Sequence, residues 1–117
     1  MNFVWILLAH WVGDYGLQTS KMAMGKSHHF KWLFLHVLTY TGVLLVCSLI
    51  LFPLKVAIGF LLINCVLHGL TDFFTSKLTS KYRKNPRIFF PILGFDQLIH
   101  AITLYITYLH RESLIFF

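Results

Sequence analysis

The chain has 117 residues, of which 57% are hydrophobic and only 12% are charged, and its mean hydropathy is +0.72. A water-soluble domain usually has about a quarter charged residues to solvate its surface, so this composition excludes that class and favours an integral membrane protein in a lipid bilayer. The net charge is +6, from 10 Lys and Arg against 4 Asp and Glu. Because the basic residues lie between long apolar segments, they indicate membrane topology and no nucleic-acid partner.

Four apolar segments are predicted to form four transmembrane helices, at about residues 3–18, 32–52, 54–76 and 91–109. Each approaches the ~20 residues that cross ~30 Å of hydrocarbon. The first contains His10 and Asp14 and has no basic region before it, so we expect a mature helix and not a signal peptide. Pro53 predicts a tight hairpin between the second and third segments, and Pro91 is predicted to open the fourth. We expect residues 1–117 to form one all-α domain, a four-helix transmembrane bundle.

Two of the three connections carry most of the basic residues: Lys21, Lys26 and Lys31 in the first, and Lys77, Lys81, Arg83, Lys84 and Arg87 in the last. The positive-inside rule places both connections in the cytoplasm and both termini outside. The predicted location is therefore a membrane that the chain crosses several times.

Three of the four acidic residues have a histidine four positions away, in the pairs His10 and Asp14, His68 and Asp72, and Asp96 and His100. A spacing of four places both side chains on one helix face. Successive predicted helices run in opposite directions, yet each pair lies near the helix end that meets a basic connection. The three pairs are therefore expected at a similar depth in the membrane. Since ionisable residues within a membrane normally face the bundle interior, we expect a polar His/Asp centre in the cytoplasmic half.

The first hypothesis is a site for one or two divalent metal ions, because imidazole and carboxylate together suit zinc, manganese or iron. The candidate ligands are His10, Asp14, His36, His68, Asp72, Asp96 and His100. A metal-activated water can attack a lipid or another phosphate-containing substrate, with a free carboxylate as general base. The catalytic candidates are Asp14, Asp72 and Asp96, and the candidates for supporting or substrate contacts are Gln18, Tyr40, Lys77 and Gln97.

Two other interpretations are non-enzymatic. The pairs can be hydrogen-bond clips between helices, as in a phage-type interaction factor, or a relay in a proton or cation carrier. The outer half of the predicted helices is nearly free of ionisable groups, which disfavours a continuous path. The spacing of Cys47 and Cys65 is typical neither of a disulfide framework nor of a zinc ribbon. The sequence is compatible with a monomer and with an oligomer.

The motifs themselves resemble a known family. They comprise His10-Trp-Val-Gly-Asp14 with Gln18, then Leu35-His36, His68-Gly-Leu-Thr-Asp72 with Lys77, and Asp96-Gln97-Leu-Ile-His100. This pattern resembles the small bacterial and phage integral-membrane proteins catalogued as domain of unknown function 3307. The resemblance implies a helical membrane protein whose His/Asp motifs are its functional centre, and it is distantly similar to membrane proteins labelled as metal-dependent hydrolases.

Overall fold

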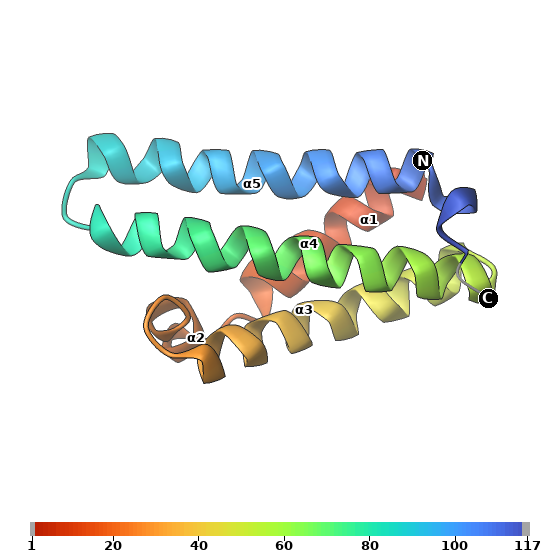
Figure 1. Ribbon diagram of the computed structural model, residues 1–117, viewed down its shortest axis with the longest axis horizontal. Coiled ribbons are helices and arrows are strands. Elements are labelled where there is room, and N and C mark those ends of the chain that lie inside the picture. Colours follow the sequence, from red (N-terminus) through yellow and green to blue (C-terminus); the bar gives the residue numbers. More distant parts are fainter. Residues whose placement is uncertain (1, 116–117) are drawn as a thin grey trace.

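The computed structural model describes residues 2–115, and every regular element in that range is a helix (Figure 1). The all-α prediction is therefore confirmed. Three long helices dominate the structure: α3 (Phe30–Leu51), α4 (Leu54–Lys81) and α5 (Pro86–Leu109). The shorter elements are α1 (Asn2–Trp11), the π-helical turn η1 (Val12–Gly16), α2 (Ser20–Gly25) and the 3-10 turn η2 (Arg111–Leu114).

The N-terminal segment differs from the first predicted crossing. α1 has 10 residues and η1 has 5, so together they rise at most about 22 Å, less than the ~30 Å of a bilayer core. Gly13 and Gly16, which disfavour a helix, lie in η1. By length and composition, three helices are able to cross a membrane, namely α3, α4 and α5.

Two helix boundaries also differ from the sequence prediction. α5 begins at Pro86, five residues before Pro91. A proline fits the first turn because its missing N–H has no helical partner there, whereas Pro91 lies inside the helix and removes one backbone hydrogen bond. α4 extends to Lys81 instead of ending near residue 76, which carries its last turns towards the basic connection.

The long helices lie side by side in chain order (Figure 1). Pro53 caps α4 directly after α3 ends, so these two helices are antiparallel, and the turn at residues 82–85 joins α4 to an antiparallel α5. α1 contacts both α3 and α5. In Figure 1, α2 and the turn between α4 and α5 lie at one end of the molecule, whereas the start of α1 and the turn η2 lie at the other. The two basic connections therefore share an end.

The structure buries many polar side chains and exposes many apolar ones, which is the reverse of a soluble protein. Among the described residues, 12 polar or charged side chains are buried but only 9 hydrophobic ones, while many leucines and phenylalanines on the long helices face outward. In water this arrangement would expose a large apolar surface, whereas hydrocarbon is a good solvent for it. The burial pattern and the helix lengths both indicate a membrane-like protein.

The interior has an apolar part and a polar part. The apolar core joins α1, α3, α4 and α5 through Ile6, Leu44, Phe52, Phe60 and Leu104, among others. The polar part lies nearer the basic connections: His36 is six residues into α3 and Asp72 is nine residues from the end of α4. A rise of 1.5 Å per residue places these groups about 9 and 14 Å along their helices.

Candidate metal centre

The polar part of the interior is a cluster of histidines and aspartates from four elements. Each of these residues is at most 5% exposed: Asp14 of η1, His36 of α3, His68 and Asp72 of α4, and Asp96 and His100 of α5. Buried charges require partners or a metal ion. This concentration of carboxylate and imidazole therefore needs a compensating positive charge.

Four ligand atoms of this cluster converge on one another, and their separations are short. His36 Nε2 lies 2.8 Å from Asp72 Oδ2, 3.0 Å from Asp14 Oδ1 and 3.2 Å from His68 Nε2. His68 Nε2 in turn lies 3.6 Å from Asp72 Oδ2 and 3.7 Å from Asp14 Oδ1. We call Asp14, His36, His68 and Asp72 the four-ligand group.

These separations scatter around those of a tetrahedral ligand set. Bonds of 2.0–2.1 Å from a metal to N or O ligands put neighbouring ligands about 3.3–3.4 Å apart, and the five distances above lie on both sides of that value. The four atoms are close enough together to hold a metal ion. A single N–H of His36 points in one direction only and cannot satisfy two carboxylates and a second imidazole equally well.

A second group lies beside the first and shares Asp14 with it. Asp14, Asp96 and His100 also offer ligand atoms close enough to hold a metal ion. His100 Nε2 lies 3.3 Å from both Asp72 Oδ1 and Asp96 Oδ1, and the Thr75 hydroxyl donates to Asp96. The two groups thus form one continuous centre.

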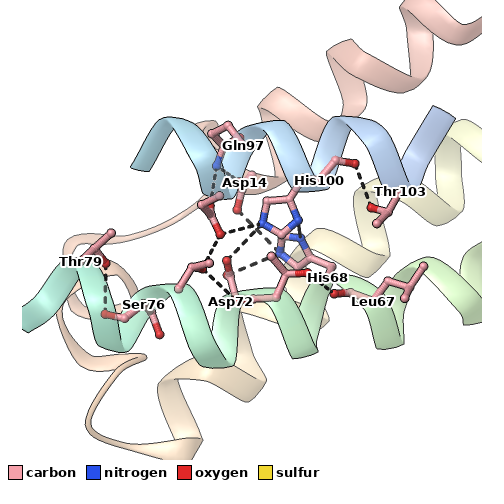
Figure 2. A network of polar contacts seen from close by, with 12 residues as sticks. Asp14, Leu67, His68, Asp72, Ser76, Thr79, Gln97, His100 and Thr103 are labelled. Atoms are coloured by element: carbon pink, nitrogen blue, oxygen red, sulfur yellow. Dashed lines mark hydrogen bonds and ion pairs between the residues drawn. The ribbon is translucent and has the colours of Figure 1, made fainter. Parts of the chain in front are cut away.

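A chain of hydrogen bonds holds the carboxylates in place. In Figure 2, Gln97 reaches from α5 towards Asp14. Its Nε2 donates to both Asp14 and Asp96 at 2.9 Å, while its Oε1 accepts from His10 Nε2 at 3.0 Å. His10 Nδ1 then accepts from the Tyr40 hydroxyl at 3.2 Å. Both ring nitrogens of His10 thus have hydrogen-bond partners, and His10 links Tyr40 to Gln97.

Ring packing orients the central histidine. The Tyr40 ring stacks on that of His68 with centroids 3.8 Å apart and planes 5° from parallel. His68 Nδ1 lies 3.2 Å from His100 Nδ1, which gives its second nitrogen a partner, as metal-binding histidines usually have. His36 differs, because no atom of residues 2–115 is a hydrogen-bond partner for its Nδ1.

The π-helical turn positions Asp14. Such turns often occur at functional sites because they rotate side chains relative to the regular helix. Gly13 packs directly on α3: a Cβ at this position would lie 3.1 Å from Tyr40 Cδ2 and 3.2 Å from Tyr40 Cα. The glycine therefore lets η1 approach α3 closely enough for Asp14 to reach His36.

Comparison with known proteins gives one match. A family model described as a protein of unknown function (DUF3307) matches residues 2–115. The chain belongs to this family. The predicted resemblance is therefore confirmed, and for this DUF3307 protein no curated protein and no solved structure gives a match.

The structure brings most candidate residues of this DUF3307 chain into one place. All seven candidate ligands lie in or beside the cluster, and Tyr40 and Gln97 contact it directly. Gln18 is one step removed, because it accepts from Lys26. Lys77 instead lies on the outside of α4, with its ammonium 3.9 Å from the centre of the Phe73 ring.

The closest contacts in the cluster do not join the residues that are four positions apart. Those pairs are separated by 3.8 Å for His10 and Asp14, 3.6 Å for His68 and Asp72, and 3.3 Å for Asp96 and His100. The shortest contacts join different elements, through His36 to Asp14 and Asp72. His36 has no acidic residue four positions away, so no local signal marks it as central.

Lys26 is the main residue that the sequence pattern does not reveal. The sequence places it in a basic cytoplasmic connection, but the turn after α2 brings its Nζ to 3.2 Å from Asp72 Oδ2 and 3.1 Å from Gln18 Oε1. Thr19 caps α2 by accepting from the Met22 N–H, which is a local signal for a helix start. Nothing in the sequence indicates that this short helix folds back over the cluster.

Proposed function

We propose that this DUF3307 protein is an integral membrane protein whose His/Asp centre binds one divalent metal ion. The observation that carries the proposal is the near-tetrahedral convergence of Asp14 Oδ1, His36 Nε2, His68 Nε2 and Asp72 Oδ2. Two imidazoles with two carboxylates suit zinc, manganese or iron, and the tetrahedral spacing favours zinc among them.

Charge supports one ion over two. Three carboxylates, Asp14, Asp72 and Asp96, face one ammonium, Lys26. With neutral imidazoles this leaves two negative charges, which one divalent ion neutralises. A second ion would add two uncompensated positive charges in a buried site, so it would need an anionic ligand of its own.

We further propose a four-helix transmembrane arrangement, with α1 and η1 as a short fourth member. The shared position of the basic connections at one end of the molecule (Figure 1) supports the orientation in which they face the cytoplasm and the chain ends lie outside. In that orientation the centre lies in the cytoplasmic half of a bacterial inner membrane, within reach of lipid headgroups.

The reaction we propose is metal-dependent hydrolysis of a lipid or another phosphate-containing substrate. Because four protein ligands fill a tetrahedron, this reaction would need a fifth coordination position for water; an ion bound in that way would lower the pKa of the water and supply hydroxide. Asp96 is the best candidate for the general base, because it lies next to the four-ligand group without belonging to it. Asp14 and Asp72 then act as ligands.

The alternative is a non-enzymatic role in which protons replace the metal. Two protonated imidazoles would also neutralise the centre and would make the cluster a set of interhelical ion pairs or a relay. A relay through the bundle is disfavoured by the apolar core of Ile6, Leu44, Phe60 and Leu104, which lies between the centre and the far end. The metal content of the purified protein distinguishes the two hypotheses, because only the metal hypothesis expects a bound ion.

Elemental analysis of untagged protein purified in detergent tests the proposal. We expect about one zinc, manganese or iron per chain in the parent, and little in Asp72→Asn, which keeps the side-chain shape but weakens ligation. Glu112→Gln is the matched control, because Glu112 is an exposed carboxylate in η2 outside the cluster. A parent without metal after incubation with all three ions would refute metal binding and favour the structural role.

A further inference from the structure

A pocket opens beside the His/Asp centre on the side of the basic connections. Its volume is about 190 Å³, and it lies between α2, the last turns of α4, the following turn and the start of α5. The residues that matter here are Lys26, Asp72, Ser76, Thr79, Arg83 and Asp96. Because Asp72 and Asp96 belong to the centre, the pocket is directly continuous with it.

The polar groups of this pocket form two sets. Arg83 is exposed in the turn between α4 and α5, and none of the ion pairs within residues 2–115 involves its guanidinium. Lys26 lies deeper, against Asp72. Cations therefore lie at both the entrance and the base of the pocket, while carboxylates occur only where it meets the centre.

Ser76 supplies the second observation. This residue is 5% exposed, and no described residue is a hydrogen-bond partner for its Oγ. A buried hydroxyl without a partner is unfavourable, and such groups are rare unless a ligand or water completes them. Thr79, one turn later, donates to the Ser76 carbonyl and lines the same wall (Figure 2).

We propose that this pocket binds the phosphate group of the substrate or product of the metal centre. The guanidinium of Arg83 is suited to two phosphate oxygens at once. The Lys26 ammonium and the Ser76 hydroxyl supply further donors to a tetrahedral anion. The phosphate can belong to a membrane lipid or to a free phosphate, since both present the same group.

The inference rests on the proposed metal site, because the net charge of the centre affects phosphate binding in the pocket. The three carboxylates of the centre outnumber Lys26 and Arg83, so the combined site has one negative charge when metal-free with neutral imidazoles. One divalent ion changes this to one positive charge. Phosphate binding is therefore expected to require the metal, and the two ligands to favour each other.

The test measures zinc content and phosphate binding on the same detergent-purified samples. Protein is loaded with zinc, freed of excess metal, and equilibrated by dialysis with radiolabelled inorganic phosphate. We expect phosphate to bind the zinc-loaded parent at least about ten-fold more tightly than the metal-free protein. Arg83→Gln should lose about ten-fold or more of that affinity at unchanged zinc content. Ser76→Ala should weaken binding as well.

Arg87→Gln is the matched control, because Arg87 is an exposed arginine near the same end of the molecule that does not line the pocket. Nanodiscs of phosphatidylcholine with phosphatidic acid then distinguish the two sources. Displacement of labelled phosphate by phosphatidic acid, and not by phosphatidylcholine alone, identifies a lipid phosphate. Without displacement, the ligand is a free phosphate.

The outcomes separate this inference from the function it rests on. Zinc retained with no phosphate binding, or with binding equal in Arg83→Gln and Arg87→Gln, overturns the phosphate pocket and leaves the metal site standing. A parent that binds none of zinc, manganese and iron overturns both.

Discussion

Replacing His36 by glutamine should remove the metal without removing the hydrogen bonds that hold the carboxylates. His36 Nε2 is the atom closest to the other ligands, at 2.8 Å from Asp72 Oδ2 and 3.0 Å from Asp14 Oδ1. A glutamine amide can still donate to a carboxylate but is a poor ligand for zinc. His36→Gln therefore separates ligation from simple pairing.

The expected size of the effect follows from the ligand count. Structural zinc sites bind with about 10–16 kcal/mol, so an equal share for one of four ligands is about 2.5–4 kcal/mol. Since each 1.4 kcal/mol is a factor of ten, the zinc affinity of His36→Gln should fall by about two to three orders of magnitude. The unpartnered Nδ1 of His36 places the expected loss at the lower end of that range.

The assay is a competition titration with a zinc-binding dye on monodisperse protein in detergent. His110→Gln is the control, because His110 is an exposed histidine whose ring makes one hydrogen bond within the described residues, to the Ile106 carbonyl. An unchanged zinc affinity in His36→Gln would refute the four-ligand group. A large loss of thermal stability with no zinc in the parent would favour a structural cluster.

Two further predictions concern how the centre is held in place. Gly13→Ala inserts a methyl group 3.1 Å from the Tyr40 ring, so it should lower stability by about 1–3 kcal/mol and reduce zinc content. Gly42→Ala, where nothing lies within 4 Å, should do neither in the same thermal unfolding and zinc assays. Asn64→Leu removes a 2.9 Å hydrogen bond from α4 to Thr107 of α5, which should cost about 0.6–1.7 kcal/mol at unchanged zinc content. Equal zinc loss in Asn64→Leu and Asp72→Asn would contradict a site confined to the cluster.

Short-range patterns are enough to find the helices and the candidate ligands. Continuous apolar runs indicate long helices, because an apolar surface on all sides is stable only in an apolar solvent. The spacing of four between histidine and aspartate predicts that each pair shares a helix face. The pattern therefore identifies His10, Asp14, His68, Asp72, Asp96 and His100 as candidate ligands, and the structure brings them together. The same motifs indicate membership of the DUF3307 family.

Boundaries are less well predicted, because they depend on weak local preferences. The sequence predicts a first crossing to about residue 18, whereas η1 ends at Gly16 and α1 is not among the three helices that are long enough to cross a membrane. It also predicts that Pro91 begins the last helix, but Pro86 does so. A single proline or glycine changes helix stability by about 1–3 kcal/mol, which packing against neighbouring helices can outweigh.

The sequence by itself indicated an apolar surrounding for this protein, the number of its long apolar helices to within one, and the histidines and aspartates that face inward. Only the tertiary structure decided which of them meet: His36 between Asp14 and Asp72, Lys26 folded over Asp72, and Arg83 at a shared pocket. The reason is physical. Helical periodicity is a local property that each segment carries alone, whereas distances between helices depend on how all of them pack, including the close approach at Gly13.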